Sequence, residues 1–361
     1  ADQKNYVVTA YFQTATLIKT IIQMASAYYT GSYYLWVIIE LVFGIIYSFI
    51  LNWKINQVYP WLKSEIKQGK MLFKNYPEVM TYTKQLFVHQ ISSFFQYQTT
   101  PFFVYTFVSL QIVAFYGNYT LIVDKLCQLM NTVLGSTSAG IGNLIAEGNN
   151  AKIETVFWEI TGIRYWIAGI IAFIIYNTLD FFIIEWIGHE YLLPKSILLL
   201  LTLKIYIQIS TGGIGQFIAG FGLFADVWSS ILQIILFVGI AVIGGKFWGL
   251  HGIILSSIIS IFAIVGIWKP YYLYTKGFKK NVWKYWSVWF KYNILTILSF
   301  FISYIILSNI NQWFSFTNIF QWLIYSICAL IIYSIISFFI YYGCIREFNY
   351  IPHRLIKLIL R

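Results

Sequence analysis

The sequence predicts an all-α polytopic membrane protein, and three observations lead to that fold class. The chain has 361 residues, of which 59% are hydrophobic and only 10% are charged, whereas soluble domains carry about 25% charged residues. Its mean hydropathy is +0.70. The apolar residues form long blocks of about 20 residues, which is the length a helix needs to cross a hydrocarbon core of about 30 Å.

The net charge of +11 has a topological meaning in such a chain. The basic residues lie between the apolar blocks, so they indicate orientation in the membrane, and no nucleic-acid partner is expected. The 3 cysteines fall in or beside the apolar blocks, and the sequence has no CxxC motif or His/Cys spacing typical of a metal site. We therefore expect no metal and no cofactor.

Ten transmembrane helices are expected from the apolar blocks, at residues 7–29, 33–53, 86–113, 116–146, 156–179, 192–214, 226–245, 249–270, 291–309 and 319–342. If residues 1–6 are cytoplasmic, most of the 24 Lys and Arg residues fall in cytoplasmic segments, and the outer segments hold only Lys195 and Lys246. This asymmetry predicts that both termini are cytoplasmic. Because the chain starts without Met or a signal peptide, we expect it to begin partway through a longer protein.

The longest segment between spans is the basic stretch 54–85, which follows the first two helices. Its aromatic and aliphatic residues alternate with lysines, so it is either an amphipathic helix on the inner leaflet or a simple connector. The outer loops are short and leave little room for a catalytic domain. We therefore expect a protein that is not an enzyme.

A run of small residues, "GSTSAGIGNLIAEG" at 135–148, interrupts this aromatic-rich chain. Small residues let helix backbones approach closely in lipid, so Gly135, Ala139, Gly140 and Gly142 predict a tight helix crossing. The same residues would permit two helices to slide past each other during alternating access, and both interpretations hold together.

Several charged residues fall inside predicted spans, where a charge is costly and therefore points to function. Four are cations, which we expect to line a polar cavity and bind substrate: Lys19, Arg164, Lys204 and Lys125. Two are carboxylates, which would couple an ion or pair with the cations: Glu40 and Asp124. The alternative for each cation is a pair with Glu40 or Asp124 across helices, or for Lys125 an extension towards the membrane surface.

The 86–113 span adds neutral polar residues that recur at helical spacing, which predicts a polar cavity wall made of Gln90, Ser93, Gln96 and Thr100. Amides and hydroxyls both donate and accept hydrogen bonds, as sugar hydroxyls require. Pro101 removes a backbone hydrogen bond and predicts a kink, either static or acting as a hinge.

Seven segments, from "YQTTPFFVY" (97–105) to "WKPYYLYTKGFK" (268–279), together resemble Wzx-like polysaccharide flippases of the multidrug/oligosaccharidyl-lipid/polysaccharide (MOP) exporter superfamily. The longest is "YGNYTLIVDKLCQLMNTVLGSTSAGIGNLIAEGN" (116–149), which is similar to the eighth-helix region of these proteins. The other six appear in the expected order: "YQTTPFFVY" (97–105), "VFWEITGIRYWIAG" (156–169), "IIEWIGHEYLL" (183–193), "GLFADVW" (222–228), "FWGLHGIILSSIIS" (247–260) and "WKPYYLYTKGFK" (268–279). The resemblance covers about residues 1–290.

The resemblance implies a MATE/MOP-like helical bundle that lacks about four helices at its start. On this map residues 1–53 are the last two helices of the N-terminal lobe and 54–85 is a cytoplasmic basic linker between lobes. Residues 86–272 form a six-helix C-terminal lobe, and 273–361 supply two extra helices with basic cytoplasmic flanks.

The expected function is flipping of a lipid-linked oligosaccharide or polysaccharide repeat unit across the bacterial cytoplasmic membrane by alternating access. The implied substrate is an undecaprenyl-pyrophosphate-linked glycan, the implied coupling ion is Na⁺ or H⁺, and polysaccharide polymerase or assembly proteins are implied partners. A multidrug antiporter of the same superfamily is the nearest alternative. A membrane enzyme or scaffold of polysaccharide assembly stays open as a third.

Overall fold

A computed structural model describes residues 5–61, 66–311 and 318–350, and the chain divides into two units, Ala1–Met80 and Thr81–Arg361. Among the described residues all regular structure is helical and none is a strand. The predicted all-α class is therefore confirmed.

The first unit is built around a hairpin of α1 (Asn5–Thr30) and α2 (Tyr33–Val58), joined at Gly31, whose φ of 60° suits glycine. The basic stretch 54–85 contains the end of α2, the short helix α3 (Ile66–Asn75) and the start of α4. It is thus largely helical. Met71, Leu72 and Phe73 of α3 are all at least half exposed.

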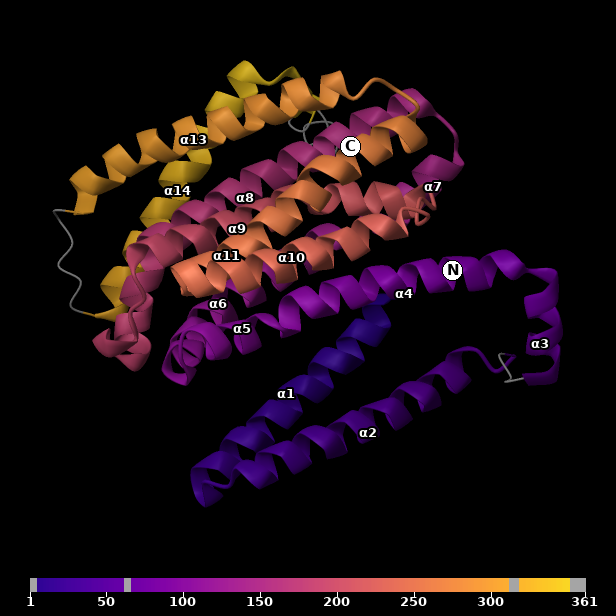
Figure 1. Cartoon of the computed structure of the whole chain (residues 1–361), viewed down its shortest axis with the longest axis horizontal. Coiled ribbons are helices and arrows are strands. Elements are labelled where there is room, and N and C mark those ends of the chain that lie inside the picture. Colours follow the sequence, from indigo (N-terminus) through magenta and orange to yellow (C-terminus); the bar gives the residue numbers. More distant parts are fainter. Residues whose placement is uncertain (1–4, 62–65, 312–317, 351–361) are drawn as a thin grey trace. The chain divides into compact units, whose positions relative to one another are not determined.

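The second unit contains the remaining helices, which Figure 1 shows running alongside one another from α6 to α11. Their bounds are α4 (Pro77–Gln98, which starts in the first unit), α5 (Thr100–Phe107), α6 (Leu110–Gly135), α7 (Ser138–Ala146), α8 (Asn150–Ile187), α9 (Lys195–Gly220), α10 (Val227–Trp248), α11 (Leu250–Ile261), α12 (Lys269–Tyr272), α13 (Trp283–Asn311) and α14 (Ile319–Cys344). From α11 the helix continues through two π-helical stretches, Phe262–Trp268 and Leu273–Phe278, on either side of α12.

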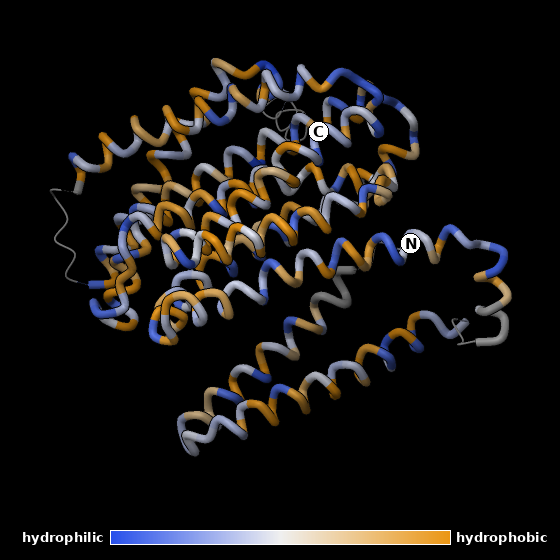
Figure 2. The backbone as a smooth tube through the Cα atoms, in the orientation of Figure 1, coloured by the Kyte–Doolittle hydropathy of each residue, from blue (hydrophilic) through white to orange (hydrophobic). Residues whose placement is uncertain are grey.

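Seven helices in the described part of the chain are long and apolar enough to cross a membrane: α2, α8, α9, α10, the continuous helix Leu250–Phe278, α13 and α14. Figure 2 shows the apolar residues that dominate these helices. Seven of the ten predicted spans therefore qualify, and the chain is a multi-pass membrane protein.

The three remaining predicted spans are helical, but they are more polar or are interrupted. The 7–29 span is α1, which carries Lys19 and Gln23 among several threonines. The 86–113 span breaks at Thr99 and again at Val108, and the 116–146 span breaks at Ser136 and Thr137. Polar residues within membrane helices are expected to face a hydrated path or another helix, so these three helices are candidates for a functional role.

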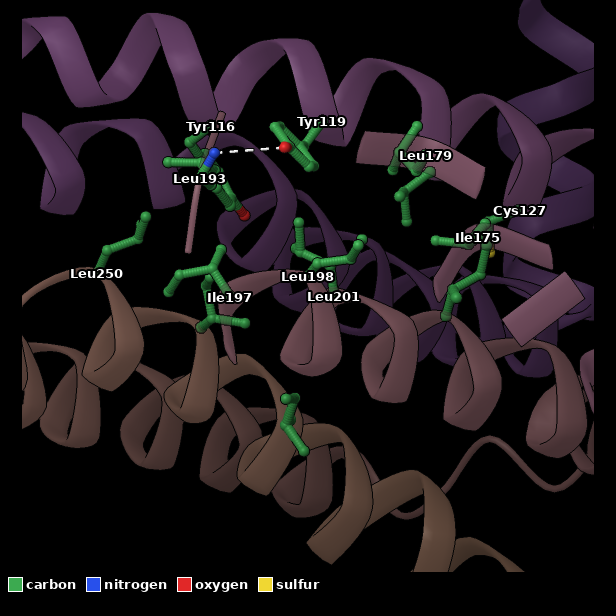
Figure 3. Packing of buried hydrophobic residues seen from close by; sticks show 14 of the residues in the cluster. Tyr116, Tyr119, Cys127, Ile175, Leu179, Leu193, Ile197, Leu198, Leu201 and Leu250 are labelled. Carbon is green, nitrogen blue, oxygen red and sulfur yellow. Dashed lines mark hydrogen bonds between the residues drawn. The ribbon is translucent and has the colours of Figure 1, made fainter. Parts of the chain in front are cut away.

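The core of the second unit lies around α8, which packs against α9, α14 and α13. Buried residues of α6, α8, α9 and α11, most of them Ile and Leu, form its largest cluster, part of which Figure 3 shows. At one end of this cluster the hydroxyl of Tyr119 accepts a bond from the Leu193 backbone N–H (3.3 Å) and donates to Asp180 Oδ1 (3.1 Å). These contacts fix α6 against the loop that joins α8 to α9.

A close helix contact in the second unit lies between α10 and α11, at Gly244 and Gly252. A Cβ on Gly244 would lie 2.9 Å from the Cα of Gly252, and a Cβ on Gly252 would lie 2.6 Å from the Cα of Gly244. The two backbones therefore touch, as small residues permit in lipid. Gly249, with φ of 54°, turns the chain between these helices.

A tight helix crossing was expected at Gly135, Ala139, Gly140 and Gly142. α7 does approach α9 at Gly142, whose Cα would lie 3.9 Å from a Cβ on Gly220, but the Cβ positions of the glycines in the run face no other helix of the described chain. A Cβ on any of these three glycines would meet no heavy atom within 4 Å, and Ala139 is exposed. α6 ends at Gly135, and the hydroxyls of Ser136, Thr137 and Ser138 each donate to a backbone carbonyl three residues earlier. These bonds satisfy carbonyls that the broken helix leaves free, so the run forms a helix break with an exposed, small-residue face.

Candidate functional site

Polar side chains inside the second unit gather along the contact between α6 and α9. On α6 they follow a spacing of three and four residues, and on α9 they recur at multiples of four, so each set lies on one helix face. We call this set, together with one residue from α8, the α6–α9 seam: Asp124, Cys127, Asn131, Arg164, Lys204, Gln208 and Gln216.

Lys204 and Asp124 occupy one end of the seam. Lys204 is 6% exposed, and its Nζ lies 4.0 Å from Asp124 Oδ1 and 5.9 Å from the centre of the Tyr97 ring. The alternative in which Lys204 pairs with a carboxylate across helices is therefore found. The pair is a loose one, since the separation exceeds the 2.7–2.9 Å typical of a charge-assisted hydrogen bond.

The middle of the seam consists of neutral groups in hydrogen-bond contact. Gln208 Nε2 donates to the Tyr97 hydroxyl at 2.8 Å, and Cys127 Sγ lies 3.7 Å from Gln208 Oε1. Asn131 Nδ2 in turn donates to Cys127 Sγ at 3.4 Å. These contacts link the environment of Lys204 to that of Arg164.

Arg164 projects from α8 into the other half of the seam and is only 2% exposed. Its guanidinium donates to Gln216 Oε1 (3.1 Å), to the carbonyl of Ile209 (3.3 Å) and to Asn131 Oδ1 (3.4 Å). Its Nε has no hydrogen-bond partner, and no carboxylate of the described chain lies within 4.0 Å of it. A buried cation is thus held by neutral acceptors alone, which is an arrangement that favours an incoming anion.

Two glycines of α9 make room for this guanidinium. A Cβ on Gly212 would lie 2.5 Å from Arg164 Nη1, and a Cβ on Gly213 would lie 3.1 Å from Arg164 Cδ. α9 remains helical through both glycines and ends at Gly220. The glycine pair beside a buried Arg is a signal that sequence reasoning missed.

Gln216 joins the seam to the helix break after Gly135. While its Oε1 accepts from Arg164, its Nε2 donates to the Leu134 carbonyl (3.1 Å), Thr137 Oγ1 (3.2 Å) and Ser138 Oγ (2.8 Å). From Lys204 to Gln216 the seam follows twelve residues of α9, or about 18 Å at 1.5 Å per residue. Polar groups therefore extend through more than half of the depth of a bilayer core.

The remaining predicted cations lie outside this seam. Lys19 belongs to the first unit, where its Nζ contacts Glu40 Oε1 at 2.5 Å, and Gln23 donates to Glu40 Oε2 at 3.0 Å. The pairing alternative is thus found for Lys19 and Glu40. Lys125 is exposed and reaches only Gln128 Oε1 at 3.5 Å, because adjacent helix positions point about 100° apart. Lys125 was expected to lie beside the other cations, and in the second unit it lies away from Arg164 and Lys204.

The predicted polar wall of the 86–113 span is split between exposed and buried positions of α4 and α5. Gln90 and Ser93 of α4 are exposed, whereas Gln96 of α4 and Thr100 of α5 are buried. Gln96 donates to Ser260 Oγ at 2.8 Å and accepts from Gln233 Nε2 at 3.1 Å, so it cements α4 to α10 and α11. The residue of α4 that reaches the seam is Tyr97, seven positions after Gln90 and therefore on the same face.

Pro101 lies in the first turn of α5, where its missing N–H costs no hydrogen bond. α4 ends at Gln98 and α5 begins at Thr100, so the helix is interrupted beside the proline. That this break acts as a hinge stays a prediction.

Gly212→Ala is expected to weaken anion binding at Arg164 without unfolding the protein. The added methyl group would displace the guanidinium of Arg164, and binding about tenfold weaker corresponds to the loss of roughly one hydrogen bond to a charged group. Gly215→Ala is the matched control, since its Cβ meets nothing within 4 Å on the same helix. The measurement pairs the binding of inorganic pyrophosphate with thermal unfolding in detergent, and equal binding by the two variants would contradict an anion-binding role for Arg164.

Lys19→Met is expected to lower the amount of folded protein in the membrane, because Glu40 would then lose its cationic partner and keep only the neutral Gln23. The double variant Lys19→Met with Glu40→Gln should restore the amount, since it removes both charges. The measurement is the yield of monodisperse protein after extraction in mild detergent. A single variant with unchanged yield would show that the pair does not stabilise the hairpin.

No known protein family, curated protein or solved structure matches this chain.

Proposed function

We propose that this chain is part of a transporter that flips a lipid-linked oligosaccharide or polysaccharide repeat unit across the bacterial cytoplasmic membrane. The observation that supports this most strongly is Arg164, a buried cation whose partners in the described chain are all neutral. A phosphate or pyrophosphate headgroup, as in an undecaprenyl-pyrophosphate-linked glycan, supplies the missing negative charge.

The charges of the seam favour binding of an anion over binding of a cation. It contains two buried positive side chains, Lys204 and Arg164, and one carboxylate, Asp124, which is partly exposed. A phosphate oxygen that replaced Asn131 or Gln216 at the guanidinium would exchange a neutral hydrogen bond for a charge-assisted one. The planar fork of Arg suits two such oxygens at once.

The amide groups of the seam suit the sugar part of the substrate. Asn131, Gln208 and Gln216 each carry both a donor and an acceptor, as hydroxyl-rich ligands require. The exposed small-residue face at 135–142 leaves space beside them. On this proposal the lipid tail stays in the membrane while the two lobes alternate access to the headgroup.

In the proposed orientation both termini face the cytoplasm, and the polymerase or assembly machinery receives the glycan on the outer side. Coupling to Na⁺ or H⁺ would use Asp124, the only carboxylate of the seam, with Glu40 as the other candidate in the first unit.

A multidrug antiporter is the nearest alternative, and the charge of the seam argues against it. Cationic drugs require an acidic site, whereas the seam carries an excess of positive charge. A membrane enzyme needs acid–base residues around a pocket. Asp180 of α8 and Lys195 of α9, near the loop between these helices, instead contact each other at 3.0 Å.

The test is complementation by the complete gene in a bacterial strain that lacks its own repeat-unit flippase. We expect surface polysaccharide to reappear and lipid-linked repeat units to stop accumulating on the cytoplasmic side. Resistance to cationic dyes without restored polysaccharide would support the antiporter instead. Neither effect, in cells whose membranes contain the protein, would overturn the proposal.

A further inference from the structure

A lateral cleft separates α13 from α8 and α9 in the second unit. Its volume is about 490 Å³, and its walls are mainly apolar and aromatic, including Leu199, Leu203, Ile297, Phe300 and Phe301. None of the residues that line it is Asp, Glu, Lys or Arg. α13 packs on α8 and α14, so the cleft lies on the side of α13 that faces α9.

Hydrogen bonds among polar side chains close one end of the cleft. The Tyr206 hydroxyl reaches Asn293 Oδ1 at 3.1 Å and Thr296 Oγ1 at 3.3 Å, and Asn293 Nδ2 donates to the Trp289 carbonyl at 2.8 Å. These hydroxyl and amide groups already form hydrogen bonds with one another. A hydrocarbon chain that contacts them therefore breaks no hydrogen bond.

The length of the cleft matches one leaflet of a membrane. Its lining along α13 runs from Asn293 to Tyr304, eleven residues further on, or about 16 Å of helix. Half of a hydrocarbon core of about 30 Å is nearly the same length. The cleft therefore accepts a chain that enters from one side and ends near the middle of the bilayer.

The positively charged side chain of Lys195 lies at the open end of the cleft. The ammonium of Lys195 donates to the Tyr176 carbonyl at 2.7 Å and lies 4.6 Å from the centre of the Tyr176 ring, which lines the cleft. Its side chain is 49% exposed although it also contacts Asp180. Lys195 is thus placed to meet a phosphate at the membrane surface while the lipid chain descends along α13.

From these four features we infer that the cleft binds one acyl chain of a bilayer phospholipid, from the leaflet on the Lys195 side, with its headgroup phosphate beside Lys195. The bound chain fills the space between α9 and α13 and so helps to hold the C-terminal helix pair against the rest of the unit. Because hydrocarbon is as apolar as the surrounding lipid, close packing in a preformed cleft provides the preference for this position.

The test uses the purified complete protein in nanodiscs that contain a phosphatidylethanolamine with a photoreactive group midway along one acyl chain. Peptide mapping should find label on the segments that hold Leu203 and Ile297. The double variant Leu203→Trp with Ile297→Trp fills the cleft and should lower this labelling about tenfold, equivalent to about 1.4 kcal/mol. Ile235→Trp is the matched control, because Ile235 is an exposed apolar residue of α10 outside the cleft.

Two outcomes would overturn the inference. One is label spread evenly over the cleft and exposed helix surfaces such as α10. The other is displacement of the label by an equal amount of polyprenyl phosphate, which would assign the cleft to a polyprenyl chain. Thermal unfolding of each variant confirms that it is folded. Labelling requires no transport, so this result and the complementation result stand or fall separately.

Discussion

Export of the lipid-linked glycan should fall about 100-fold when Arg164 is replaced by Gln. On the proposed function, the guanidinium would supply the positive charge that a phosphate headgroup needs, and each hydrogen bond to a charged group contributes about 1.5–3 kcal/mol. Loss of a bidentate contact is therefore worth at least two factors of ten. The shorter, neutral Gln side chain leaves no unpaired charge at this buried position, so the fold should persist. The measurement is the rate of surface polysaccharide synthesis at equal protein level.

Two further variants separate charge from geometry. Arg164→Lys keeps the charge but lacks the planar fork, so we expect partial export. Lys125→Gln is the control, because Lys125 is exposed and lies outside the seam. Normal export by Arg164→Gln, in protein of normal stability, would show that Arg164 only holds helices together. The proposed headgroup site would then have no central residue.

Gly252→Val should prevent the protein from folding. A Cβ at this position would lie 2.6 Å from the Cα of Gly244, and backbone cannot move aside as a side chain can. Overpacking of a core usually costs about 1–3 kcal/mol, and forcing two helix backbones apart should reach or exceed the upper value. We expect little monodisperse protein after extraction in mild detergent, as measured by fluorescence-detected size exclusion.

Gly140→Val is the matched control for this prediction. Gly140 also lies in a helix, but a Cβ there would meet nothing within 4 Å. Its variant should give a normal yield, although its bulk on the exposed small-residue face should slow export. A normal yield of Gly252→Val would mean that α10 and α11 do not cross as closely as described.

Much of the candidate site was visible in the sequence as single residues. Arg164, Lys204 and Asp124 are conspicuous because each is a charge within an apolar block. Their grouping was not visible, since it depends on which faces of α6, α8 and α9 meet. Tyr97, Gln208 and Gln216 were missed for the same reason. Lys125 was included because it too is a charge within a predicted span, and only the packing of α6 on α9 shows that it lies on another face.

Local sequence by itself determined the helices and the membrane class, because apolar blocks of sufficient length satisfy their backbone hydrogen bonds only as helices in lipid. Tertiary structure alone decided which small residues make a crossing. Gly252 meets a facing backbone, whereas Gly140 meets open space. It also decided that Lys19 is paired while Arg164 has only neutral partners. The physical reason is that helix formation depends on neighbours in the chain, whereas packing and charge neutralisation depend on residues that approach from other helices.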